Sequence, residues 1–382
     1  MKNIKRLLSA MLVLVLAFSF AGCHKKDEIA VTVGEWKFTS AYYMCAFLQA
    51  NDEAQALVYQ NLSDEDKQNA DLDYTKQKVE GKKYETWVKD RAVERITEIA
   101  ALKTICKDNK ITIDEETKET YSDLLDSVWE DTQYGYYYAS YYFGDQLAYG
   151  SSLALKYEQN GVAKSTYLSF VIDNLLSDKY FEFLYAEDGT REIPMADVEK
   201  EFYDNNILAN VLYTQYDTDA TDDEKKEFKE KLDKYVEALE DGKMTFEEVY
   251  NDYNEIEEEE KDTSEDESKE ETDEHEDHDH EETLEPKDSL ATQLTSEDDY
   301  YDTIKKMKTG EVKLIEDEDT GYVLVVKKDI KKDDYYIKTN DMDVRYTLKG
   351  EEFSKEITDF ANTLKPEVDD FATGQFKVKN IK

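Results

Sequence analysis

The sequence pattern changes from mainly helices to helices with strands over residues 192–216, EIPMADVEKEFYDNNILANVLYTQY. Pro194 opens a helix in which Val198 and Phe202 recur at the four-residue spacing of an amphipathic face. The apolar residues of 207–216 then follow one another as in a buried strand. Helical patterns dominate before this stretch, and strands appear among helices after it. The sequence therefore predicts an α+β fold, with a mainly helical part followed by a part in which strands occur among helices.

Helical patterns occupy most of the chain before residue 192. Residues 29–38 alternate as in a strand-turn-strand, and a capped helix follows them. Residues 51–83 are predicted to form a polar linker, and 117–185 to continue as helices. Between them, one helix ending near Asn109 is defined by apolar residues at three- and four-residue spacing: Trp87, Val93, Ile96, Ile99, Ala100, Leu102 and Cys106.

Helices and short strands are predicted after residue 216. The expected elements are a helix over 222–241, another from Thr245, a helix over 298–308, a strand over 321–328 and a final helix from about Asp343 to Pro366.

The formal net charge of −43 at pH 7 excludes nucleic acid as a partner, because phosphate is repelled. The same repulsion disfavours electrostatic adhesion to an anionic membrane. Much of the charge lies in 255–288, where residues 255–285 alone hold 19 acidic residues and two lysines among 31. Such a segment buries too little apolar surface to offset its ordering entropy, so we predict a disordered loop.

The N-terminus has the pattern of a lipoprotein signal peptide over residues 1–22. Basic residues precede an apolar run over 7–18, which is too short for a comfortable transmembrane helix. Small residues lead directly to Cys23, as in a bacterial lipobox, where the thiol takes a diacylglycerol. The alternative is a plain secretory signal with an incidental cysteine. We expect the mature chain to be lipid-anchored on the extracytoplasmic face of a bacterial cell membrane.

Two further cysteines, Cys45 and Cys106, lie in segments predicted as amphipathic helices. Each is expected to be a small buried apolar residue. A disulfide between them is the alternative, since the compartment can be oxidising.

A run dense in tyrosine lies between Tyr134 and Tyr149. Tyrosine offers large amphipathic area at little entropy cost, which suits a peptide-binding surface. The competing interpretation is that the rings pack helix against helix with their hydroxyls at the rim. The candidate peptide-binding residues are Tyr136, Tyr137, Tyr141, Tyr142 and Phe143.

The order of these segments resembles the PrsA/SurA family of extracytoplasmic foldases. Residues 30–39 are similar to the family's opening strand and helix cap, and 96–112 to its helix ending before a turn. Residues 192–203 are similar to the linker helix that enters its parvulin-type prolyl isomerase domain. The resemblance implies a signal peptide over 1–22, a helical chaperone domain over 23–204, a parvulin-like domain over 205–330, and a C-terminal segment, 331–382, that packs back on the chaperone domain.

Within the parvulin-like part, the resemblance implies a degenerate isomerase. The family has a histidine in its first strand, where this chain has Asn210 or Val211, and a second in its last strand, where it has Val323. Phe246 is similar to the aromatic residue of a family helix, and Tyr322 precedes the second histidine position. These residues are the pocket candidates: Asn210, Val211, Phe246, Tyr322 and Val323.

Three histidines, His275, His278 and His280, alternate with carboxylates in the acidic loop. Imidazole and carboxylate are competent zinc or nickel ligands, so this tract is a candidate metal site. The competing interpretation is a solvated polyanionic loop that discourages aggregation.

The leading functional hypothesis is a membrane-anchored chaperone for unfolded or newly secreted polypeptides, with weak or no isomerase activity. An active parvulin-type isomerase is the first alternative. A solute-binding lipoprotein of an importer is the second, and it would require two lobes with parallel strands. No cofactor is expected, and a homodimer is compatible with the leading hypothesis.

Overall fold

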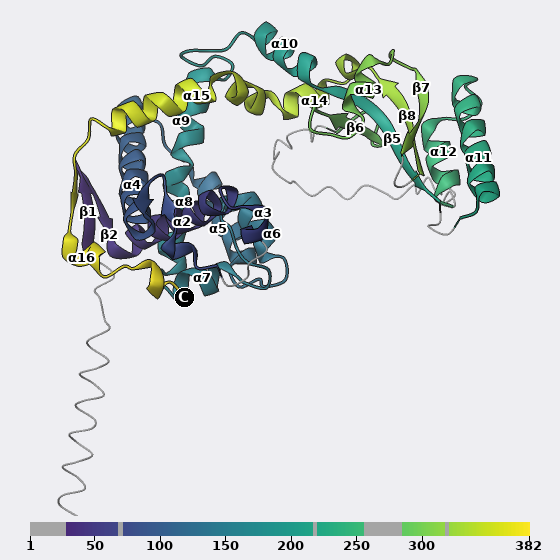
Figure 1. The fold of residues 1–382 in the computed structure, drawn as a ribbon. Helices are drawn as coiled ribbons and strands as arrows, with labels where there is room; N and C mark the ends of the chain where they lie inside the picture. The colour runs from purple at the N-terminus through teal and green to yellow at the C-terminus, as the bar shows by residue number, and fades with distance from the viewer. Residues whose placement is uncertain (1–27, 68–71, 217–219, 256–284, 318–320) are drawn as a thin grey trace, which may run out of the picture. The chain divides into compact units, whose positions relative to one another are not determined.

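The computed structural model describes residues 28–67, 72–216, 220–255, 285–317 and 321–382 (Figure 1). The chain divides into two compact units. The first unit combines Met1–Glu192 with Lys349–Lys382, and the second unit is Ile193–Leu348. Helices together with small antiparallel sheets make the fold α+β, as the sequence predicts.

A three-stranded sheet joins the two chain segments of the first unit. Its strands are β1 (Ile29–Val33), β2 (Trp36–Thr39) and β9 (Pro366–Val368), in the order β2-β1-β9. Both pairings are antiparallel, and Val31 lies opposite Val368. The predicted strand-turn-strand is therefore present, with a third strand from near the C-terminus beside it.

Helices make up most of the rest of the first unit. They are α2 (Ser40–Gln60), α3 (Asp64–Lys67), α4 (Tyr84–Asn109), α5 (Glu115–Val128), α6 (Gly135–Phe143), α7 (Leu153–Glu158), α8 (Lys164–Asn174), α9 (Leu176–Tyr185) and α16 (Asp370–Gly374). Of these helices, α2, α4 and α16 contact the three-stranded sheet. A two-stranded hairpin, β3 (Lys78–Val79) and β4 (Lys82–Lys83), precedes α4. The core holds the apolar face predicted for α4, including Ile96 and Ala100, together with Phe47 of α2 and Phe170 of α8.

The prediction of a polar linker over 51–83 is wrong at its start, because α2 continues to Gln60. Ala50, Ala54 and Val58 keep the four-residue spacing of a buried face and are buried. The side chain of Asn51 is also buried and accepts a hydrogen bond from the Tyr84 hydroxyl at 3.1 Å. Some polar residues of this segment therefore lie on the exposed side of a packed helix.

The second unit is built on a four-stranded antiparallel sheet. Its strands are β5 (Ile207–Gln215), β6 (Ala291–Leu294), β7 (Val312–Asp317) and β8 (Gly321–Lys328), in the order β6-β5-β8-β7. Its helices are α10 (Met195–Asn205), α11 (Asp222–Glu240), α12 (Phe246–Tyr253), α13 (Tyr301–Lys306) and α14 (Asp334–Thr339). The strands predicted over 207–216 and 321–328 and the helix over 222–241 are confirmed.

Different helices cover the two faces of this sheet. Leu212 and Leu324 pack with residues of α11 and α12. Val323 and Val325 pack instead with residues of α13. Alternation along β5 and β8 therefore decides which candidate pocket residues share a face.

The unit boundaries differ from the domain boundaries expected at residues 205 and 330. The second unit begins at Ile193 and runs to Leu348, within α15 (Asp341–Ala361). Buried Arg345 donates to the backbone carbonyl of Ile193 at 2.9 Å, and the Tyr336 hydroxyl donates to the carbonyl of Ala291 at 3.0 Å. These long-range contacts attach α14 and the start of α15 to the sheet unit.

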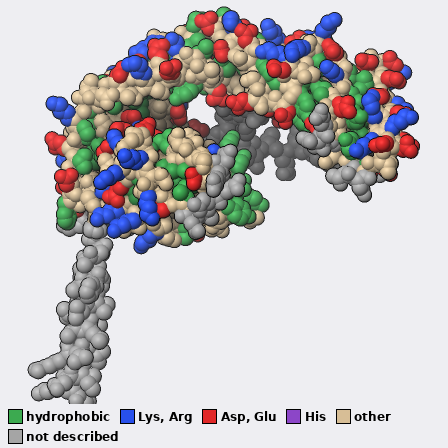
Figure 2. Space-filling view, viewed as in Figure 1, with side chains coloured by type: hydrophobic (Ala, Val, Ile, Leu, Met, Phe, Trp, Pro, Cys, Tyr) green, Lys and Arg blue, Asp and Glu red, His purple; other side chains and the backbone are tan. Residues whose placement is uncertain are grey.

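Acidic and basic side chains are interspersed on the visible face of the molecule (Figure 2). Many form pairs one helical turn apart, such as Lys229 with Asp233 at 2.7 Å on α11. Such pairs on exposed helices add a few tenths of a kcal/mol each, so packing of the apolar faces remains the main source of stability.

Candidate functional site

Exposed tyrosines gather on α6 and the segments beside it. Tyr137 is 56% exposed and Tyr141 is 71% exposed, unusually high fractions for such large rings. We call the tyrosine surface the set of exposed tyrosines Tyr134, Tyr136, Tyr137, Tyr141, Tyr142 and Tyr149.

The rings of the tyrosine surface are arranged in register along α6. Tyr137 and Tyr141 lie one helical turn apart, with ring centroids 6.1 Å apart and planes inclined by 10°. Tyr138 and Tyr142 repeat this geometry on the next row, at 6.0 Å and 18°. The parallel rings present their faces to one another and leave edges and hydroxyls available to a ligand.

The opposite side of α6 is anchored in the core. Ala139 is buried, and the ring of Phe143 lies against Tyr121 and Tyr167 at centroid distances of 6.4 and 6.1 Å. Of the candidate peptide-binding residues, only Phe143 therefore fits the interpretation of helix packing. Tyr136, Tyr137, Tyr141 and Tyr142 remain on the exposed side.

A buried polar network holds the chain where it leaves α6. The carboxylate of Asp145 accepts hydrogen bonds from the hydroxyls of Tyr157, at 2.5 Å, and Tyr167, at 3.0 Å. It also pairs with Lys156, whose ammonium lies 2.5 Å from Asp52 on α2. Burial raises the pKa of both tyrosines, and Asp145 raises it further, so these hydroxyls keep their protons and donate.

A recess of about 360 Å3 borders the tyrosine surface. Tyr142, Phe143 and Gly144 form one wall, and Gln49 and Arg95 contribute polar groups. Further lining residues are Tyr121, Phe170, Val171, Asn174, Leu175 and Asp178. The exposed rings therefore continue into a concave surface of mixed polarity, as an extended peptide would require.

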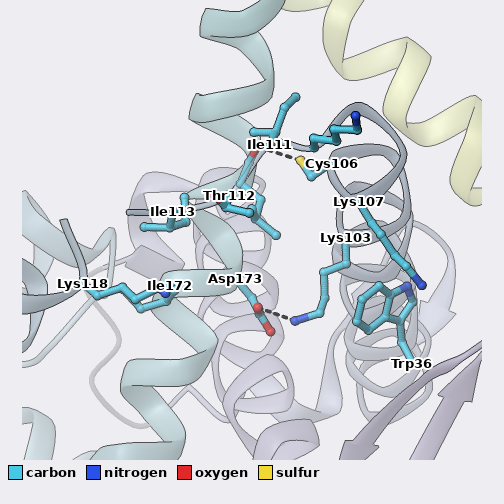
Figure 3. Close-up of a pocket in the computed structure, with 12 residues that line it drawn as sticks. Trp36, Lys103, Cys106, Lys107, Ile111, Thr112, Ile113, Lys118, Ile172 and Asp173 are labelled. Carbon is cyan, nitrogen blue, oxygen red and sulfur yellow. Dashed lines mark hydrogen bonds and ion pairs between the residues drawn. The ribbon is translucent and has the colours of Figure 1, made fainter. Parts of the chain in front are cut away.

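A second pocket of the first unit, of about 390 Å3, is bordered by lysines (Figure 3). We call it the lysine-rimmed pocket. Its apolar lining includes Trp36, Ile111, Ile113 and Ile172, and its lysines are Lys103, Lys107, Lys110 and Lys118. The pocket is not evident from the sequence, because its lysines are spread over α4, the residue that follows α4, and α5. A cluster of basic residues in so acidic a chain is the signal that could have indicated it.

The five pocket candidates of the second unit do not converge. Asn210 is buried on the sheet face of α11 and α12 and donates to the Asp288 carboxylate at 3.2 Å. Phe246 and Tyr322 pack on that same face. Val211 and Val323 pack on the opposite face, against α13. Phe246 and Val323 are core residues, which gives both a structural role.

The two cysteines of the first unit, Cys45 and Cys106, are free and buried, so the alternative of a disulfide is not realised. Burial raises the pKa of the Cys106 thiol to about 11, and it raises that of Cys45 as well. Both thiols are therefore protonated and unreactive at neutral pH.

The candidate lipidation site, Cys23, and the candidate metal ligands, His275, His278 and His280, lie outside the described residues. Within the described ranges, no group of three or more His, Cys, Asp or Glu side chains is placed to hold a metal ion. In the same part of the chain, no helix is long and apolar enough to cross a membrane.

No protein-family model matches this chain, and no curated protein matches it.

Proposed function

We propose that this chain is a membrane-anchored extracytoplasmic chaperone that binds unfolded, newly secreted polypeptides at its tyrosine surface. The observation that carries the proposal is the ordered row of exposed rings on α6, with Tyr137 and Tyr141 parallel at 6.1 Å. The exposed edges of such rings contact apolar side chains, and their hydroxyls form hydrogen bonds with peptide groups. Because each ring has few rotatable bonds, it loses little conformational entropy on binding.

The placement of the motif-bearing segments supports the resemblance to the PrsA/SurA family. The segment similar to the family's first isomerase strand lies in β5, and Phe246 begins α12. The last family strand corresponds to β8, which pairs with β5 along its whole length.

The sheet geometry favours a chaperone without isomerase activity. The family's paired histidines belong to one polar network, so their positions must share a face of the sheet. Val211 and Val323 share the face covered by α13, whereas the side chain of Asn210 lies on the other face. On the face covered by α13, the candidate positions 211 and 323 both hold valine, which offers no hydrogen bond to a twisted amide.

The strand pairings give no support to the solute-binding alternative. That hypothesis requires parallel strands with helical crossovers, whereas every pairing among the described strands is antiparallel.

The test of the proposal is suppression of client aggregation by the mature protein. Tyr137→Ser combined with Tyr141→Ser removes the most exposed parallel pair, and we expect it to reduce protection severalfold with the unfolding free energy unchanged. The matched control is Tyr59→Ser with Tyr213→Ser, which removes two exposed tyrosines elsewhere. Equal protection by the parent and the α6 variant would reject the tyrosine surface. No protection by the parent would reject the chaperone function.

A further inference from the structure

The lysine-rimmed pocket combines an apolar interior with basic groups at its mouth. We propose that it binds a large apolar side chain of an unfolded polypeptide whose neighbouring residues are acidic. The inference rests on the proposed function, because its ligand is a segment of a client.

The apolar wall of the pocket is held in place before any ligand binds. The indole nitrogen of Trp36 donates to the Thr104 hydroxyl at 2.9 Å, which fixes the ring. The Lys103 ammonium lies 5.0 Å from the centroid of that ring, within the range of a cation–π contact. A volume of about 390 Å3 accommodates one large side chain together with its flanking peptide groups.

Lys103 belongs to the frame of the pocket. Its ammonium pairs with Asp173 at 2.5 Å, and both side chains are largely buried. The Tyr42 hydroxyl also donates to Asp173, at 2.9 Å. The ion pair of Lys103 with Asp173, dashed in Figure 3, neutralises the Asp173 carboxylate. This carboxylate is therefore not left unpaired to repel an acidic ligand.

The other lysines are available to a ligand. Lys107 pairs with Glu35 at 2.6 Å and Lys118 with Glu115 at 2.6 Å, and all four side chains are exposed. Exposed pairs of this kind contribute little stability, so a ligand carboxylate can replace Glu35 or Glu115 at small cost. Lys110 caps α4 with a left-handed backbone and pairs with no described acidic residue.

The position of the lysines favours a peptide over a single-headed amphiphile. Lys118 lies across the pocket from Lys107 (Figure 3). Carboxylates on both sides of an inserted side chain can therefore each meet a lysine, whereas a fatty acid has one carboxylate. With a net charge of −43, the chain repels acidic segments generally, and the lysine rim supplies the local attraction they need.

The experiment is fluorescence anisotropy at low salt with the mature protein and a labelled pentapeptide, phenylalanine between two pairs of glutamates. We expect Lys107→Glu combined with Lys110→Glu to weaken binding about tenfold, as the loss of two charge contacts implies. The matched control is Lys226→Glu with Lys229→Glu on α11, which makes the same change in net charge. It should leave binding within about twofold of the parent, because neither lysine lines the pocket.

Two further peptides complete the test. Glutamine in place of glutamate should weaken binding to the parent but not to the Lys107/Lys110 variant, and alanine in place of phenylalanine should weaken binding to both. Equal affinity for the glutamate and glutamine peptides, or equal losses in both lysine variants, would overturn the proposal. Binding of laurate but not of the acidic peptide would also overturn it.

The chaperone assay separates this inference from the proposed function. The Tyr137/Tyr141 variant should still bind the acidic pentapeptide. If the parent protects a client and the Tyr137/Tyr141 variant protects it less, but the acidic pentapeptide does not bind, only the pocket proposal is rejected. Peptide binding at the pocket without protection of any client rejects the chaperone function on which it rests.

Discussion

Lys156 and Asp145 form an ion pair inside the first unit, and the Asp145 side chain is fully buried. The ammonium of Lys156 also contacts Asp52 at 2.5 Å, and it donates to the backbone carbonyl of Gln146 at 3.1 Å. The Lys156 ammonium thus pairs with two carboxylates and also binds the backbone that follows α6. Burial alone lowers the pKa of Lys156, but Asp145 and Asp52 outweigh it and raise the pKa, so the cation persists.

Removing this cation should strongly destabilise the first unit. Lys156→Met leaves the buried carboxylate of Asp145 and the partly buried carboxylate of Asp52 without their partner, and we expect the unfolding free energy to fall by about 3–5 kcal/mol. Urea denaturation followed by tyrosine fluorescence measures the change. The control, Lys200→Met, breaks an exposed pair with Asp204 on α10 and should cost at most about 1 kcal/mol. Similar losses of unfolding free energy in the two variants would contradict the assignment of the larger effect to burial.

The stability contributed by Asp52 should depend on pH. Burial raises its pKa to about 6, with Lys156 opposing the shift, whereas the unfolded chain has a value near 3.9. The folded state therefore binds the proton more tightly, and this stabilisation is present below about pH 4 and lost as the pH rises to 6. Asp52→Asn should become more stable relative to the parent over that window, by roughly 3 kcal/mol.

Asp288 provides the control of opposite sign. Burial alone would raise its pKa, but the ion pair with Lys328 at 2.7 Å and the hydrogen bond from Asn210 lower it. Its stabilisation is therefore present above the unfolded value and lost as the pH falls. Relative to the parent, Asp288→Asn should lose stability as the pH rises from 3 to 5. Parallel trends for Asp52→Asn and Asp288→Asn in urea denaturation would contradict the assignment.

The sequence predicted those elements whose apolar spacing is regular. The helix containing Ile96 and the strands β5 and β8 follow directly from such spacing. The short β6 and β9 were missed, since three or four residues carry no periodicity and depend on pairing with distant partners. The Asp145 network was also missed, because its members converge only after α2, α7 and α8 have packed.

The mature protein should not accelerate prolyl cis–trans exchange. The uncatalysed barrier is about 18–20 kcal/mol, and the valines at 211 and 323 supply no polar group to lower it. A proline tetrapeptide assay measures the rate. Phe246→Ala is a poor probe, because Phe246 packs from α12 into the core against the sheet and its loss would destabilise the second unit by about 3–5 kcal/mol. Catalysis that rises with protein concentration and falls in Val211→Ala would contradict the prediction.

Cys23→Ser should release the protein from the membrane. Two acyl chains anchor a protein stably, whereas the acidic chain has no electrostatic reason to remain at an anionic surface. Fractionation of expressing cells should find the variant in the medium or the soluble extracytoplasmic fraction. Its far-ultraviolet circular dichroism should match that of the parent domain. Continued retention of Cys23→Ser in the membrane fraction would show that the lipobox interpretation is wrong.

The pairing of β1 with β9 sets an order of events during folding. β1 is the first of the described strands and β9 the last, with Val31 opposite Val368. A chain that is synthesised from its N-terminus therefore presents β1 with an unpaired edge until β9 has been made. The second unit is formed by one continuous stretch of the chain. It does not depend on a later segment and can therefore fold first. A protein proposed to protect emerging chains thus leaves one strand edge of its own unpaired until β9 has been made.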